Sequence, residues 1–196
     1  MERFTLFAEP WWVNILILAP FVLYYFCRGT LQVTTRTLII SAIFGIAFGF
    51  VEAVVVVYLR AAVGLLPGYG GAFSEISRLS SGLFQQAQIL GQLPQDLLVI
   101  ETFREAATIL MLLSIALLTG KTLKEKSAMF FWTFAIWDIF YYAGLWSLVR
   151  WPGSLTATDV LFLIPVPWYS QVWFPILVSV LMILSVILCT NKLKRF

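Results

Sequence analysis

The sequence predicts an all-α membrane protein, a bundle of about five transmembrane helices that forms a single domain over residues 1–196. Composition is the first reason. Hydrophobic residues make up 61% of the chain and charged residues 12%, and the mean hydropathy is +0.92. A soluble domain of this size could not cover so much apolar surface, so lipid is the expected solvent.

The second reason is the length of the apolar runs. A helix needs about 20 mainly apolar residues to cross the hydrocarbon core of a bilayer. Five runs approach or exceed this length, and each is read as one span. They cover residues 11–27, 38–60, 97–119, 129–149 and 172–190.

The basic residues predict the direction of these spans, because cytoplasmic loops carry an excess of Lys and Arg. Eight basic residues fall on one side of the predicted topology, and few fall on the other. We therefore expect the N-terminus outside and the C-terminus in the cytoplasm of a cell with an inner (plasma) membrane. The eight residues are Arg28, Arg36, Lys121, Lys124, Lys126, Lys192, Lys194 and Arg195.

The long outer connection predicts one further helix. After a run of turn residues at 67–71, apolar side chains recur at helical spacing over residues 73–90, with polar residues largely on the other face. This pattern is typical of an amphipathic helix that lies on a membrane surface or caps a bundle.

The connection before the last span is also apolar. Leu161 to Tyr169 is too short and too rich in proline to cross a membrane as a helix, so we expect a re-entrant or interfacial segment. Irregular backbone at that depth is tolerated where it is buried in protein or lines a wet cavity. Tryptophans and a tyrosine near this end predict an outer aromatic belt made by Trp11, Trp12, Trp146, Trp151, Trp168, Tyr169 and Trp173.

Ionisable residues inside three of the spans are the candidate functional site. A charged side chain at a helix centre costs roughly 2.5 to 3.5 kcal/mol on insertion scales, so these groups should face the bundle interior and meet one another. Glu101, Glu105 and Thr108 share one face of their helix. Two tyrosines follow Asp138 by three and four residues, so a phenol could donate to its carboxylate. The candidates for ligand or ion binding are Glu52, Glu101, Glu105, Asp138, Arg60, Arg104, Tyr141 and Tyr142.

Charge balance favours function for this cluster over a purely structural ion-pair network. Four acids face two arginines, so in a dry bundle protons or a cation must balance the excess. The sequence identifies no cofactor and no catalytic or metal-ligating set, although a bound cation would fit the carboxylates. The absence of His removes the commonest general base and metal ligand.

Two smaller features concern packing. Ser41, Gly45, Gly49 and Ala53 recur every four residues, a ladder of small side chains that lets another helix approach closely. The contact could be intramolecular or could join two copies of the chain, and the intramolecular one is favoured. The two cysteines, at positions 27 and 189, are expected to be free thiols.

Three stretches resemble an uncharacterised family of small bacterial multi-pass integral membrane proteins with no assigned activity. They are residues 134–142, residues 161–168, and the Glu-Ala pairs that begin at Glu52 and Glu105. The resemblance runs from the second span to the fifth. It implies a bacterial source and a shared fold, and it carries over no residue roles.

Three functions stay open at this point. The first is a buried site, open toward the outer face past Arg60, Arg150 and Asp159, that binds or conducts a cation, protons or a small ligand. The second is an accessory or structural subunit of a larger membrane complex. The third is a membrane-embedded enzyme that acts on a lipid or isoprenoid. Beyond the bilayer, the expected partners are a second copy or a larger complex, and the scattered basic residues exclude nucleic acid.

Overall fold

The computed structural model describes residues 4–29, 31–62 and 95–190. This part of the chain is mainly helical, with one two-stranded sheet. A 3₁₀ helix, η1 (Trp11–Leu18), continues into α1 (Ala19–Cys27). The longer elements are α2 (Thr35–Ala62), α5 (Gln95–Thr119), α6 (Leu123–Val149) and α7 (Trp173–Cys189), and the strands are β1 (Thr158–Phe162) and β2 (Trp168–Gln171).

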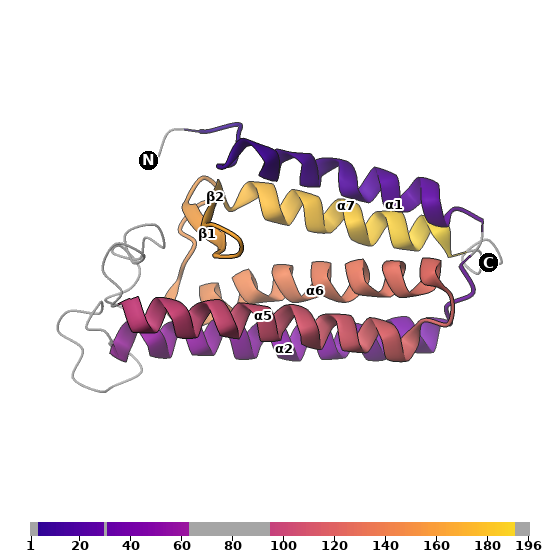
Figure 1. The fold of residues 1–196 in the computed structure, drawn as a ribbon, viewed down its shortest axis with the longest axis horizontal. Coiled ribbons are helices and arrows are strands. Elements are labelled where there is room, and N and C mark those ends of the chain that lie inside the picture. Colours follow the sequence, from indigo (N-terminus) through magenta and orange to yellow (C-terminus); the bar gives the residue numbers. More distant parts are fainter. Residues whose placement is uncertain (1–3, 30, 63–94, 191–196) are drawn as a thin grey trace.

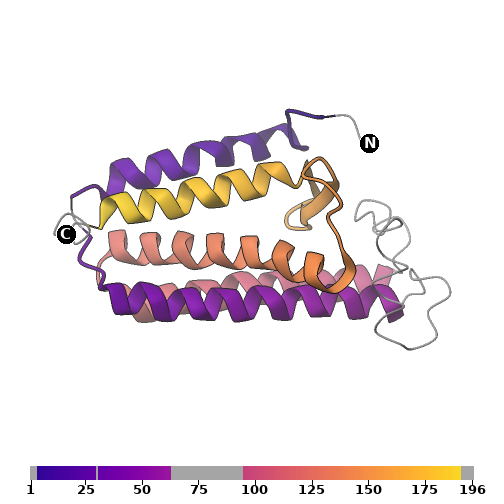
Figure 2. The same ribbon diagram turned by 180° about the vertical axis from the view of Figure 1, so that it is seen from behind.

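The helices run up and down in two layers on either side of α6 (Figures 1 and 2). α1 lies beside α7, whereas α2 and α5 lie on the opposite side. α6 is the central helix: it packs most extensively on α2 and also on α5 and α7. α5 and α7 both pack on α6 but not closely on one another.

Small residues bring α2 and α6 together. A Cβ atom placed on Gly49 would lie 2.5 Å from the carbonyl oxygen of Trp137, and one on Gly45 would lie 3.2 Å from that of Thr133. Gly144 completes the contact from α6, since its Cβ position is 2.8 Å from the Cβ of Ala53. The predicted ladder of small residues therefore serves an intramolecular contact.

The connection between α6 and α7 is a β-hairpin, which the all-α prediction missed. β1 and β2 are antiparallel, with Thr158 opposite Gln171 and Val160 opposite Tyr169. The N-terminal segment adds to the free edge of β2, because Glu9 and Tyr169 exchange backbone hydrogen bonds of 2.8 and 2.7 Å. The segment 161–169 is thus non-helical, as expected, but it consists of parts of two paired strands and their turn, and the pairing supplies backbone hydrogen bonds within the protein.

The loops at the end opposite the hairpin carry basic residues. Arg28 follows α1, Arg36 lies in the first turn of α2, and Lys121 precedes α6. α6 begins six residues earlier than its predicted span because Thr122 and Glu125 form a capping box, in which each side chain accepts a backbone hydrogen bond from the other residue.

Some predictions fall outside the described residues, namely the amphipathic helix at 73–90 and the basic residues of the C-terminal tail. The aromatic belt is wrong in one member: Trp151 is only 4% exposed and packs against Tyr142 and Val172, whereas Trp11 and Trp146 are exposed.

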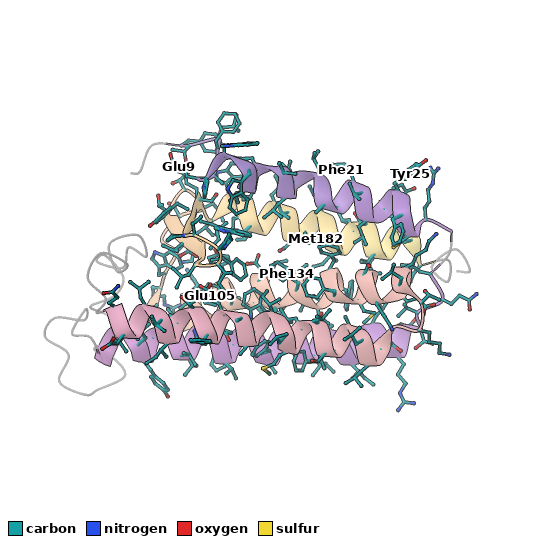
Figure 3. All side chains as sticks on the ribbon, viewed as in Figure 1. Glu9, Phe21, Tyr25, Glu105, Phe134 and Met182 are labelled. Atoms are coloured by element: carbon teal, nitrogen blue, oxygen red, sulfur yellow. The ribbon has the colours of Figure 1, made fainter. Side chains whose placement is uncertain are left out.

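Two of the described helices, Thr35–Leu59 within α2 and Leu123–Val149, are long and apolar enough to cross a membrane by length and composition. Large apolar side chains point outward over the surface of the described bundle, as Figure 3 shows for Phe21 and Tyr25 on α1. Several polar side chains are instead buried, among them Ser41, Thr133 and Ser185.

Candidate functional site

The candidate site begins on one face of α5. The buried residues of this helix are Glu101, Glu105, Thr108, Leu112 and Ala116, which recur at the spacing of a single helical face. The predicted shared face of the two glutamates and Thr108 is therefore present. It is turned toward α2, α6 and the hairpin.

Arg104 joins α5 to α2 through an ion pair. Its guanidinium donates to Glu52 on α2, and its Nε donates to Glu101 Oε2 at 2.8 Å. The other carboxylate oxygen of Glu52 accepts from the Thr108 hydroxyl at 2.8 Å. These polar contacts connect two helices that do not pack closely, and they balance part of the acidic charge.

Glu105 links α5 to the hairpin through a hydrogen bond to the backbone. Its Oε2 accepts the backbone N–H of Leu163, just after β1, at 2.7 Å. The side chain is buried. Within the described residues no Lys or Arg lies within ion-pair distance of it.

Asp138 of α6 has different partners from those predicted. Its Oδ2 accepts from Ser179 on α7 at 2.8 Å. The Tyr142 hydroxyl, expected to serve Asp138, donates to Asp159 of β1 at 2.7 Å. Asp159 is 1% exposed, so it is an interior residue and not part of an open entrance.

A cavity of about 340 Å³ collects these groups. Its size lies in the range of small-molecule sites in proteins. The lining comes from η1, α2, α5, α6, α7 and the hairpin, and α5, α6, α7 and the hairpin contribute most of it. The polar members are Glu52, Glu101, Arg104, Glu105, Thr108, Asp138, Tyr141, Tyr142, Asp159 and Ser179.

Aromatic rings form much of the wall. Phe134 lies against Trp137, Phe162 lies against both, and Trp168 packs on Phe162 with ring centroids 5.4 Å apart. The indole nitrogens of Trp137 and Trp168 are buried, and within the described chain neither has a hydrogen-bond partner. Buried donors without partners are rare in folded proteins.

The polar lining residues gather toward the hairpin, among apolar hairpin side chains such as Leu161 and Ile164, and the other end of the cavity is apolar. In Figure 3 Glu105 lies toward the hairpin, whereas Phe134 and Met182 lie further along the space between α5 and α7. Phe130, Phe131 and Met182 line the far end. A ligand here would meet carboxylates and aromatic faces together.

The carboxylates do not form a metal centre in the described part of the chain. No group of three or more Cys, Asp or Glu side chains there is placed to hold one metal ion. Cys27 and Cys189 are buried thiols that form no disulfide within the described residues, and they donate to the carbonyls of Lys124 and Tyr24. The acidic groups are spread along the cavity wall.

The structure brings most of the predicted residues to one cavity. Glu52, Glu101 and Arg104 form the ion-paired group, and Glu105, Asp138, Tyr141 and Tyr142 line the remainder. Arg60 is within α2, but its side chain lies outside the described residues. Sequence reasoning missed Ser179 and the Leu163 N–H, for which no local pattern gives a signal.

Comparison with known protein families, curated proteins and solved structures gave no match for this chain.

Proposed function

We propose that this protein crosses a bacterial inner membrane with five helical segments and binds a small organic cation in its acidic, aromatic-walled cavity. Helix length supports the first part. α2 and α6, at 28 and 27 residues, reach about 42 and 40 Å at a 1.5 Å rise per residue. The combined η1 and α1 reach about 30 Å, because a 3₁₀ helix rises about 2.0 Å per residue.

Burial supports the membrane setting further. The described helices expose Ile43, Phe103, Leu110 and Leu118, whereas Glu52, Thr108 and Asp138 are buried. Lipid is the solvent that suits such a surface, and ionisable groups inside a bundle then face its interior. The basic residues at the end opposite the hairpin support a cytoplasmic location for that end.

One observation carries the ligand proposal: Glu105 and Asp138 face the cavity without a cationic partner among the described residues. Arg104 is already shared by Glu52 and Glu101. A buried carboxylate away from water requires a proton, a cation or several donors. A protonated amine supplies both charge and hydrogen-bond donors.

The aromatic wall favours an organic cation over a hard metal ion. Phe134, Trp137, Phe162 and Trp168 offer ring faces, which attract ammonium groups. Hard cations instead need six or more oxygen ligands for Ca²⁺ or near-octahedral geometry for Mg²⁺. The dispersed carboxylates of the described chain do not suit either ion.

Titration calorimetry with benzylamine on the detergent-purified protein tests the proposal. Wild type should bind benzylamine more tightly than the neutral benzyl alcohol. Glu105→Gln and Asp138→Asn should each weaken benzylamine binding about tenfold or more, because each removes one partner of a buried charge pair. Asp96→Asn, at an exposed site on the same helix α5, should leave the affinity unchanged.

Two results of the benzylamine titrations would overturn this proposal. One is the absence of benzylamine binding to a folded wild-type protein. The other is equal binding by wild type, Glu105→Gln and Asp138→Asn. Tighter binding of Mg²⁺ or Ca²⁺ than of benzylamine would also favour an ion site over an organic-cation site.

A further inference from the structure

We infer that the ligand is a single-chain amphiphile that enters sideways from the lipid: its amine lies at the carboxylate end, and its hydrocarbon chain extends between α5 and α7. This inference rests on the proposed cation site and adds the class of ligand and its direction of entry.

The lining of the cavity is the first observation. On α6 it runs from Phe130 to Tyr142, a distance of about 18 Å along the helix at a 1.5 Å rise per residue. All polar lining residues of the described chain lie toward the hairpin, and Phe130, Phe131 and Met182 close the other end. A small polar ligand would leave this apolar end without contacts.

The rim is the second observation. Leu16, Ile109, Phe130 and Phe134 line the cavity and are only partly buried, whereas Glu105 and Asp138 are buried. These four residues lie within helices and not in the loops at their ends. The helices α5 and α7 pack on α6 but not closely on each other. An apolar rim at mid-helix favours contact with lipid chains over contact with water.

Charge complementarity chooses the headgroup. The polar end holds five carboxylates, Glu52, Glu101, Glu105, Asp138 and Asp159, and Arg104 is the one cation that lines it within the described residues. An acidic headgroup such as a phosphate or carboxylate would meet repulsion there. An amine headgroup is attracted by the same groups.

Photolabelling in lipid nanodiscs tests the inference. The probe is a dodecylamine with a diazirine near the chain terminus, and the matched control is the dodecanoic acid with the same diazirine. The amine should label residues of the apolar end, such as Phe131 and Met182, and excess benzylamine should compete with it. The acid should label these residues about tenfold less, because its charge has the wrong sign.

A pair of variants on α7 separates the cavity from the lipid surface. Met182 is buried and lines the cavity, whereas Leu184 is 47% exposed and does not line it. Met182→Trp should reduce labelling of the apolar end by about tenfold. The larger indole ring would fill part of the space in which the hydrocarbon chain of the probe is buried. Leu184→Trp should leave the labelling unchanged, and benzylamine should still bind both variants.

The outcomes separate the two proposals. Labelling spread evenly over lipid-exposed residues, with benzylamine still bound, would overturn the amphiphile inference and leave the cation site intact. Equal labelling of the apolar end by amine and acid would also overturn it. If the folded wild-type protein does not bind benzylamine, this result would instead contradict the proposed function on which the inference depends.

Discussion

The two faces of α6 differ in how they meet their neighbours. Toward α2, Gly45, Gly49 and Gly144 allow the two helices to approach so closely that an added Cβ atom would meet the neighbouring helix. Toward α5 and α7, Phe130, Phe134 and Trp137 project into an open space of about 340 Å³. One helix therefore provides both a rigid support and the wall of a site.

The difference shows how side-chain size can create a cavity. Small residues remove the spacing between helices, whereas large rings hold neighbours apart and are too stiff to fill every gap. α5 is then connected to α2 by Arg104, Glu52 and Thr108 instead of by close packing. The following substitutions test these contrasting roles, from the largest expected effect to the smallest.

Arg104→Met should lower the free energy of unfolding by about 3 kcal/mol, because it leaves two carboxylates buried without their cation. Denaturant or thermal unfolding in detergent measures this loss. Adding Glu52→Gln and Glu101→Gln to the same chain should recover most of the stability. A loss below about 0.5 kcal/mol, the level of an exposed pair, would show that the ion pairs do not connect α5 to α2.

Gly49→Leu should cost about 2 kcal/mol, because the new side chain would meet the Trp137 carbonyl and the Tyr141 backbone nitrogen of α6. Ala47→Leu is the control on the same helix, at an exposed position. It should change stability by less than about 0.5 kcal/mol. Equal effects in thermal unfolding would contradict the close α2–α6 contact.

Thr108→Val should cost about 1 kcal/mol, since it removes the hydroxyl that donates to Glu52 while keeping the shape of the side chain. Thr102→Val provides the comparison, because the Thr102 hydroxyl donates to the Leu98 carbonyl of its own helix. The difference between the two variants in unfolding experiments measures the link between helices. A larger effect at Thr102 would argue against it.

Val178→Leu should change stability by less than about 0.5 kcal/mol, because the added methylene enters space that is already open. It is the counterpart of Gly49→Leu on the other face of α6. Thermal unfolding of both variants under one condition gives the comparison. A cost at Val178 equal to that at Gly49 would mean that the cavity side is as tightly packed as the α2 side.

The sequence predicts the helices well because their signal is local. Length and composition mark 38–60 and 129–149, and the observed α2 and α6 extend each by a few residues. The hairpin is different: its strands have five and four residues, and prolines lie between them. Its pairing is stabilised by distant groups, Glu9 at the edge and Glu105 beneath it, which no local pattern reveals.

The candidate site shows the same contrast between what a local sequence pattern predicts and what depends on distant residues. Buried charge in an apolar run predicts an inward-facing residue, and Glu52, Glu105 and Asp138 all face the interior. The choice of partner depends on which helices are neighbours. Asp138 accepts a hydrogen bond from Ser179 because α7 lies against α6. Tyr142 donates to Asp159 because β1 passes close to the Tyr142 hydroxyl.

The position of α1 beside α7 has a consequence for biogenesis. If the helices insert in the order of synthesis, α2 can be joined by α6 while the ribosome is still translating, but α1 meets its main partner, α7, last. Ser185 of α7 then donates to the Pro20 carbonyl of α1, a bond across 165 positions of the chain. A chain that ends before α7 would leave α1 without this bond and with only its smaller contact with α6.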